Sequence, residues 1–165
     1  IRGIRFKNKK TNNYKMKKKI LIICANFYPD ISSRLKNSAE KYLRNREFNT
    51  NYISVPGIFE IPIVIVKNIK KFNGFVALGC VIKGKTPHFD YIIRSTFDAL
   101  MHISMKYKKP IGNGIITALN KSQATERSSK IVSLKSKNKG LDAAKAVIEV
   151  LKKWFKNLAK SHPLE

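Results

Sequence analysis

Residues 75–90 read FVALGCVIKGKTPHFD. An apolar run from Phe75 to Leu78 leads into a basic loop that contains Gly84, and a run with helical spacing continues from His88 to Met105. This order indicates a buried strand, a loop and the start of a helix. In α/β proteins such a junction offers free backbone N–H groups and the positive end of a helix dipole to phosphate groups. The segment therefore predicts an α/β fold with a phosphate site.

Strand-like and helix-like segments alternate along the rest of the chain. We predict strands at 20–25, 49–55, 74–80 and 110–119, and helices at 30–46, 59–69, 88–106, 122–129 and 141–158, with a basic connection at 131–139. Asp30 or Ser32 is expected to cap the first helix; Thr86 is expected to cap the third, with Pro87 as its first residue. Alternation of this kind requires crossover connections and produces a parallel sheet with helices on both faces.

Ligands of parallel sheets bind beyond the carboxyl ends of the strands. Phe27 follows the first predicted strand, where an aromatic ring can stack on a flat heterocycle, and Glu60 follows the second. His88 lies in a first helical turn, where the dipole favours a neutral imidazole that can accept a proton beside a bound phosphate. Each residue also has a plain structural alternative: Phe27 as core, Glu60 as a carboxylate favoured by the dipole, and His88 as a capping or packing side chain.

Gly79 to Thr86 also matches the phosphate-loop pattern G-x-x-x-x-G-K-T of nucleotide hydrolases. Pro87 follows directly, in the turn whose amides should wrap the phosphates. No later strand ends in the aspartate that would help to hold Mg²⁺. The loop also follows the third strand, whereas a phosphate loop usually follows the first. Nucleotide hydrolysis is therefore only a minor alternative.

The chain is strongly basic, with 34 Lys and Arg against 10 Asp and Glu and a net charge of +24. Nucleic-acid or membrane binding is one interpretation, and a composition bias spread over the whole surface is the other. The lysines are dispersed and no nucleic-acid motif accompanies them, which favours the second; we do not expect nucleic acid as a partner. No apolar run approaches the roughly 18 residues of a membrane span. Two cysteines without a C-x-x-C pair predict reduced thiols in a cytoplasmic protein and no metal site.

The length of 165 residues indicates one domain. We expect 1–16 to be a basic extension, with Met16 as a natural start, and 17–160 to be the domain. We expect 161–165 to be a tail left by cloning. The basic start followed by residues 20–25 imitates a signal peptide, but this apolar run is too short for one.

Six blocks then identify a family. ANFYPDIS, VPGIFEIP, ALGCVIKGKTPHFDYI, IGNGIIT, QATER and NKGLDAA occur in the order seen in 6,7-dimethyl-8-ribityllumazine synthases, and the chain resembles that family over about residues 17–155. The resemblance implies a flavodoxin-like three-layer α/β/α sandwich. Its four-stranded parallel sheet would have the order 2-1-3-4, with an N-terminal strand of a neighbouring subunit as an extension. It also implies homopentamers with active sites between neighbouring subunits.

The implied reaction is the penultimate step of riboflavin biosynthesis, with riboflavin synthase as the downstream partner. It condenses 5-amino-6-(D-ribitylamino)uracil with 3,4-dihydroxy-2-butanone 4-phosphate, expels phosphate and water, and requires no metal or organic cofactor. His88 matches the proton-transfer residue and Phe27 the ring-stacking position. The remaining matches are Ile58, Phe59 and Glu60 for the ribityl chain; Cys80, Val81 and Ile82 for the pyrimidine; Gly84, Lys85 and Thr86 for the phosphate; and Asn113, Arg127 and Lys139 from the neighbour, with Arg127 on the phosphate.

Some residues depart from the family pattern. Asn113 stands where many relatives carry Phe, and Lys85 replaces a common Glu or Ala. Segment 128–138 is longer than in capsid-forming relatives, and such lengthening tends to block icosahedral packing. We therefore expect a pentamer, with a decamer as the larger alternative, rather than a 60-subunit shell. A flavin-binding protein without turnover and a basic nucleic-acid binder are the competing functions.

Overall fold

The structure is a computed structural model that describes residues 18–130 and 137–161, with side chains described as far as Trp154. The predicted extension 1–16 and the tail beyond Ser161 lie outside the described residues, as does most of the predicted connection 131–139. The boundaries expected for these segments therefore stay predictions.

Within the described residues, four parallel strands form one sheet of order β2-β1-β3-β4. The strands are β1 (Lys19–Ala25), β2 (Asn49–Val55), β3 (Gly74–Ile82) and β4 (Ile111–Ala118). Residues 20–25 are buried throughout, as a central strand covered on both faces requires. The predicted flavodoxin-like sandwich and its strand order are confirmed.

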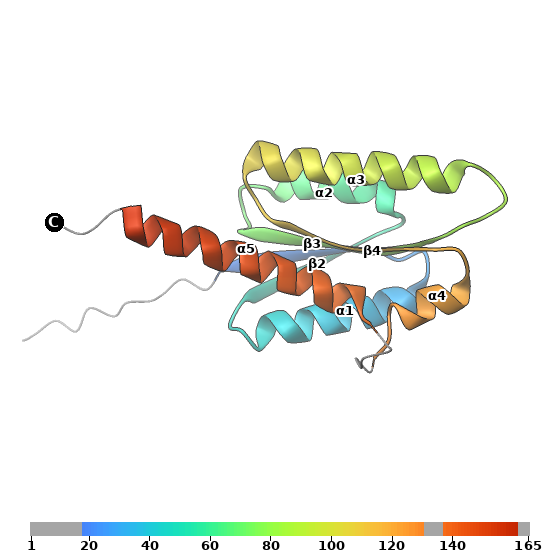
Figure 1. Ribbon diagram of the computed structural model, residues 1–165, viewed down its shortest axis with the longest axis horizontal. Coiled ribbons are helices and arrows are strands. Elements are labelled where there is room, and N and C mark those ends of the chain that lie inside the picture. The colour runs from blue at the N-terminus through green and yellow to red at the C-terminus, as the bar shows by residue number, and fades with distance from the viewer. Residues whose placement is uncertain (1–17, 131–136, 162–165) are drawn as a thin grey trace, which may run out of the picture.

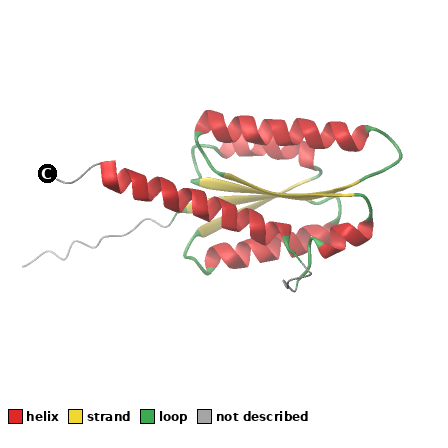
Figure 2. Ribbon diagram, in the orientation of Figure 1, coloured by secondary structure: helices red, strands yellow, loops and turns green. Residues whose placement is uncertain are grey.

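Helices cover both faces of this sheet (Figure 1). On one face lie the 3-10 turn η1 (Ile58–Glu60), α2 (Ile61–Asn68) and α3 (His88–Tyr107). The other face carries α1 (Pro29–Arg44), α4 (Lys121–Glu126) and α5 (Lys139–Ser161), and Figure 2 shows the resulting three layers edge-on. Each face has its own apolar core, one including Ile22 and Val147 and the other Ile23 and Phe75. In the described part of the chain, no helix combines the length and apolar character that crossing a membrane requires.

The predicted helix caps are wrong. Tyr28 occupies the N-cap of α1 and Pro87 that of α3, and neither makes a side-chain capping hydrogen bond. Ser32 instead lies inside α1, where its buried Oγ donates to the Ala25 carbonyl at 2.7 Å and ties the helix to β1. Pro29 explains the first case, because its fixed φ suits the first helical position and so starts α1 before Asp30 and Ser32.

Other boundaries also differ from prediction: α4 ends at Glu126 rather than at 129, and α5 spans Lys139–Ser161 rather than 141–158. Two further differences have a clear physical reason. The helix expected at 59–69 is divided, because the Glu60 carboxylate accepts a hydrogen bond from the Gly57 N–H at 3.0 Å and closes a 3-10 turn before α2 begins. The third strand runs two residues further than expected, to Ile82, because β4 continues to pair with it up to Ala118.

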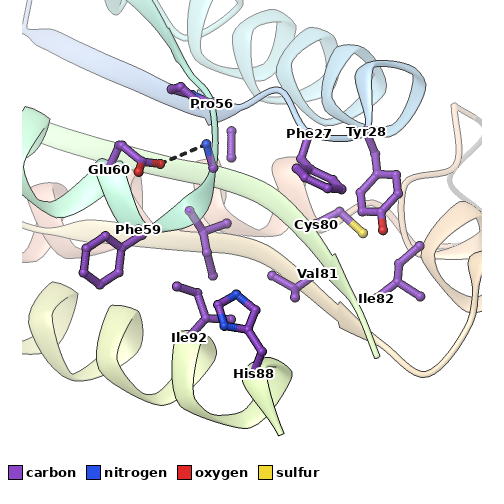
Figure 3. Close-up of a pocket in the computed structure, with 13 residues that line it drawn as sticks. Phe27, Tyr28, Pro56, Phe59, Glu60, Cys80, Val81, Ile82, His88 and Ile92 are labelled. Atoms are coloured by element: carbon purple, nitrogen blue, oxygen red, sulfur yellow. Dashed lines mark hydrogen bonds between the residues drawn. The ribbon is translucent and has the colours of Figure 1, made fainter. Parts of the chain in front are cut away.

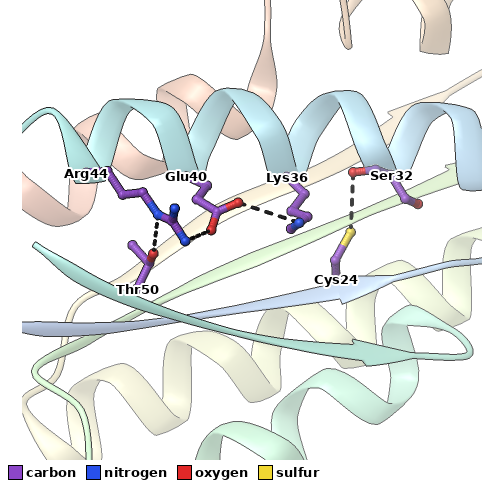
Figure 4. Close-up of polar contacts among 6 residues, drawn as sticks. All are labelled: Cys24, Ser32, Lys36, Glu40, Arg44 and Thr50. Carbon is purple, nitrogen blue, oxygen red and sulfur yellow. Dashed lines mark hydrogen bonds and ion pairs between the residues drawn. The ribbon is translucent and has the colours of Figure 1, made fainter.

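A polar cluster joins α1 to β2 at the edge of the sheet (Figure 4). The Glu40 carboxylate lies 3.5 Å from Lys36 Nζ and 2.6 Å from Arg44 Nη2, and Arg44 Nε donates to Thr50 Oγ1 at 3.2 Å. Exposed ion pairs of this kind each stabilise a fold by less than about 1 kcal/mol. The cluster therefore fixes orientation more than it adds stability.

Lys108→Gly is expected to raise the free energy of unfolding by about 1 kcal/mol. Lys108 is the exposed C-cap of α3 and has a left-handed backbone with φ 50°. Glycine adopts this conformation without the clash between Cβ and the carbonyl oxygen. Urea unfolding checks the result, with Lys106→Gly inside the same helix as the control that should lose stability. A Lys108→Gly protein no more stable than the parent would contradict the expectation.

Candidate active site

A cavity of about 470 Å³ opens beyond the carboxyl ends of β1, β2 and β3, beside the start of α3 (Figure 3). The sheet therefore positions it where parallel α/β folds bind ligands. Most of its walls are apolar, with few polar side chains among them. It is lined by Ala25, Phe27, Tyr28, Pro56, Gly57, Ile58, Phe59, Glu60, Cys80, Val81, Ile82, His88 and Ile92.

Two aromatic rings form the wall that follows β1. Phe27 is 70 % exposed, and its ring meets that of Tyr28 edge to face at 5.0 Å between centroids. Tyr28 is half-buried and packs on the core, so it can hold the Phe27 ring in place. An exposed aromatic ring with such support is suited to stacking on a flat heterocycle.

The turn after β2 forms the next wall. Ile58 is buried, whereas Phe59 is 63 % exposed. The Glu60 carboxylate is partly used within the fold, because Oε2 accepts the bond from Gly57 N (Figure 3). Among the described residues its other oxygen accepts no hydrogen bond, so it can accept one from a ligand hydroxyl.

The end of β3 supplies backbone groups as well as side chains. Among the described strands, β1 pairs with β3 only as far as Leu78, while β4 accompanies β3 to Ile82. The edge of β3 that faces β1 is therefore open from Gly79 onward, beside Cys80, Val81 and Ile82 in the cavity. An unpaired strand edge offers both N–H donors and C=O acceptors, the groups that a pyrimidine ring needs for recognition.

Burial raises the pKa of the Cys80 thiol from an ordinary 9.0 to about 11. It raises the pKa of Cys24 to about 11 too, because burial outweighs the hydrogen bond with Ser32 and the charge of Lys36. Both thiols are free and buried. The Cys80 thiol is therefore a neutral wall of the cavity at pH 7 rather than a nucleophile.

Iodoacetamide at pH 8 is expected to modify Cys80 about 100-fold more slowly in the folded protein than in urea, because the thiolate fraction is that much smaller.

The same pKa shift also determines how the free energy of unfolding changes with pH. The folded pKa lies above the unfolded one, so the stabilisation is present below pH 9 and is lost as the pH rises through 11. The free energy of unfolding should fall by about 2 kcal/mol per thiol over that window. Equal modification rates in folded and unfolded protein would contradict the predicted difference in reactivity. The Cys24→Ala variant has one buried thiol fewer, so its free energy of unfolding should fall less as the pH rises.

The loop between β3 and α3 lies outside the cavity walls. His88 lines the cavity from the first turn of α3, but Gly84, Lys85 and Thr86 are exposed and do not line it. Gly84 has no left-handed backbone, and an added methyl group would contact nothing within 4 Å. This position therefore does not use the conformational freedom of glycine, because the loop is open here and its backbone is not left-handed. The open space leaves the backbone accessible to an anion.

Three predicted site residues lie elsewhere on the chain. Asn113 is an exposed residue of β4 whose Oδ1 accepts from Ile115 N at 3.0 Å. Arg127 follows α4, and its Nη1 donates to the Thr117 carbonyl at 3.2 Å. Lys139 begins α5, and its N–H donates to the Arg127 carbonyl at 2.9 Å. Within one chain none of the three lines the cavity.

Eight predicted site residues thus surround one cavity: Phe27, Ile58, Phe59, Glu60, Cys80, Val81, Ile82 and His88. Five further wall residues were not among the predicted site residues: Ala25, Tyr28, Pro56, Gly57 and Ile92. Ile92 lies one helical turn after His88, and the spacing of four residues is the signal that could have identified it. Among the described residues, no three His, Cys, Asp or Glu side chains form a group that could hold a metal ion.

Comparison with known proteins gives a consistent answer. The family model of 6,7-dimethyl-8-ribityllumazine synthase matches residues 17–154. A 6,7-dimethyl-8-ribityllumazine synthase from Campylobacter curvus is 40 % identical over 147 residues, which is 86 % of this chain and 91 % of the relative. One from Bartonella tribocorum is 41 % identical over 147 residues (85 % and 95 %), and one from Beijerinckia indica is 37 % identical over 134 residues (79 % and 72 %). The chain therefore belongs to the 6,7-dimethyl-8-ribityllumazine synthase family of riboflavin-biosynthesis enzymes.

Proposed function

We propose that this chain condenses 5-amino-6-(D-ribitylamino)uracil with 3,4-dihydroxy-2-butanone 4-phosphate, at a site that two neighbouring copies build together. The product is 6,7-dimethyl-8-ribityllumazine, and phosphate and water leave. One observation carries the proposal: the cavity has walls suited to a flat heterocycle, while Arg127 and Lys139 lie outside it on the same chain.

The pyrimidine substrate occupies the cavity in this proposal. Its ring stacks on Phe27 and forms hydrogen bonds with the open backbone edge of β3 at Cys80 to Ile82. The ribityl chain lies along Ile58 to Glu60, where the carboxylate can accept from its hydroxyls. The apolar walls exclude water from the ring and leave orientation to few polar groups, as is usual for small-molecule sites.

The phosphate of the second substrate lies at the loop 84–86. Open space at Gly84 and the start of α3 directly after the loop support this assignment. Lys85 adds a positive charge there, and Arg127 of the adjoining copy completes the anion site. Lys139 of that copy lies beside it and contacts the substrates. Asn113 of that copy offers a side-chain amide where many relatives offer an aromatic ring.

His88 transfers protons between the two substrates. The amine of the pyrimidine attacks the ketone carbonyl, and a first water leaves as the Schiff base forms. Phosphate is then eliminated, which leaves a new carbonyl after proton transfer. The ribitylamino nitrogen attacks this carbonyl and expels a second water as the ring closes. Each step moves a proton, and an imidazole in the cavity wall can accept and return it. Holding both substrates together supplies much of the rate, since effective molarities of about 10⁵ M or more are available from positioning.

The proposed assembly is the homopentamer that the family resemblance implies, and a site shared head to tail between copies is compatible with such a closed ring. A decamer is the next larger form. Light scattering should give about five times the chain mass of 18.8 kDa, and a monomer with full activity would contradict a shared site. We assign the protein to the cytoplasm, which the two free thiols support.

The direct test is to mix both substrates with the purified protein and follow lumazine absorbance and fluorescence. Product should form without added metal or cofactor. A folded protein that binds riboflavin but forms no product would instead be a flavin-binding relative. Binding to nucleic acid that weakens steeply with salt and competes with lumazine would favour the basic-binder alternative.

A further inference from the structure

Arg127 and Lys139 are neighbours in space although eleven residues separate them in the sequence. The Lys139 N–H donates to the Arg127 carbonyl at 2.9 Å. The next pair inward, Ser128 and Asn138, forms an antiparallel bridge, and both residues are fully buried. The chain therefore leaves α4 and returns to α5 at the same place, bringing the backbones of the two cationic residues together.

The side-chain amide of Asn138 fastens this junction from both of its ends. Nδ2 donates to the Ser129 carbonyl at 2.9 Å, which links the returning chain to the outgoing one. Oδ1 accepts from the Leu141 N–H at 3.1 Å, the bond of an N-cap in the first turn of α5. A short side chain that donates and accepts at once is required here, and asparagine provides it.

Neighbouring contacts attach the junction to the sheet. Arg127 Nη1 donates to the Thr117 carbonyl near the end of β4 at 3.2 Å. Ser128 Oγ donates to the Thr125 carbonyl of α4 at 3.1 Å, and the Asp142 N–H donates to the Asn138 carbonyl at 3.1 Å. The backbone on both sides of the cations is thereby fixed relative to β4, so this part of the chain needs less ordering when an anion binds.

We propose that Asn138 is a positioning residue that holds Arg127 and Lys139 together as one clamp for the phosphate-bearing substrate. The proposal rests on the proposed function, in which these two cations serve the adjoining copy. Asn138 itself is 1 % exposed, so its side chain is not accessible to a substrate. Its effect is confined to the geometry of the pair, and it should therefore act on phosphate affinity and not on pyrimidine affinity.

Asn138→Ser tests this role without changing charge. Serine can still accept the N-cap bond, but its side chain is too short to donate to the Ser129 carbonyl. We expect about a tenfold rise in KM for the phosphate-bearing substrate and in the inhibition constant of inorganic phosphate, as expected for one lost buried hydrogen bond. The KM for the pyrimidine and kcat should stay within about twofold, since neither depends on the clamp.

Asn73→Ser is the matched control at the opposite end of the sheet. Asn73 Oδ1 accepts from the Lys19 N–H at 2.8 Å and also joins two distant chain segments. The Asn73→Ser variant should lower the unfolding temperature. It should not change the KM for the phosphate-bearing substrate or the inhibition constant of inorganic phosphate. If Asn138→Ser does not fold, Asn138→Thr provides the same neutral cap for the same measurements.

Unchanged phosphate constants in Asn138→Ser would overturn the proposal, and so would an equal rise in Asn73→Ser. A separate variant tests the proposed function on which this inference rests. If Arg127→Ala leaves both phosphate constants unchanged, then the proposed anion role of the cations fails, whatever Asn138 does. If Arg127→Ala raises them but Asn138→Ser does not, only the positioning role is wrong.

Discussion

Arg127→Ala is expected to lower kcat/KM for the phosphate-bearing substrate by about 100-fold, because it removes charge-assisted hydrogen bonds to a dianion. The fold should tolerate the change. Arg127 is exposed, and within the described part of the chain its side chain donates one hydrogen bond, to the Thr117 carbonyl. Steady-state kinetics with each substrate varied in turn should place most of the loss in KM for the phosphate-bearing substrate.

Mixing two inactive proteins gives the sharper form of this test. A double variant, Phe27→Ala with His88→Ala, has a defective cavity but keeps Arg127. Arg127→Ala has an intact cavity but lacks the cation. If neighbouring copies share a site head to tail, random assembly of equal amounts pairs an intact cavity with an intact cation in about a quarter of the sites. Co-refolding the two should therefore restore about a quarter of the parent activity.

Each variant refolded alone controls for residual turnover, and mixing after assembly controls for exchange of subunits. Without recovery in the co-refolded sample, Arg127 and the cavity would have to belong to the same copy. The geometry of one chain makes that outcome informative, since Arg127 is bonded to the end of β4 and does not line the cavity.

The sheet could be predicted from sequence because burial on both faces leaves a clear pattern. The apolar run 20–25 and the alternation of strands with helices fixed β1 and the parallel arrangement, and β2 has the predicted bounds. Helix starts could not be predicted as well. Asp30 and Thr86 have the right chemistry for a cap, but Pro29 begins α1 ahead of Asp30, and Pro87 takes the N-cap position of α3. A carboxylate at Glu60 closed a 3-10 turn that periodicity does not reveal.

Some residues of the candidate site could likewise be predicted from the sequence, and others could not. Residues at strand ends gather at one edge for topological reasons, so Phe27, Glu60 and His88 could be expected around one cavity. No pattern within the sequence tells whether Arg127 serves the cavity of its own chain, because that depends on assembly. Asn138 also escaped sequence reasoning. Its importance comes from bonds to Ser129 and Leu141 that exist only once the chain has returned.

Gly140→Ala is expected to destabilise the protein by about 3 kcal/mol or more, although alanine is the better helix former. Gly140 lies in the first turn of α5, where a methyl group would overlap the carbonyl of Leu35 in α1. Both sides of that contact are backbone, so no side chain can rotate to make room. The two helices would have to separate, and the core between them contains Leu35 and Val147.

Gly84→Ala is the matched substitution, because its methyl group would meet open space and its φ is not positive. Urea unfolding of the two variants should therefore differ by about 3 kcal/mol, with Gly84→Ala within about 0.5 kcal/mol of the parent. Gly84→Ala should instead affect the kinetics. Its methyl group stands where the phosphate would approach, so it should raise the KM for the phosphate-bearing substrate. Equal stability of the two variants would mean that α1 and α5 do not pack through Gly140. An unchanged KM in Gly84→Ala would move the phosphate away from the 84–86 loop while leaving the packing argument intact.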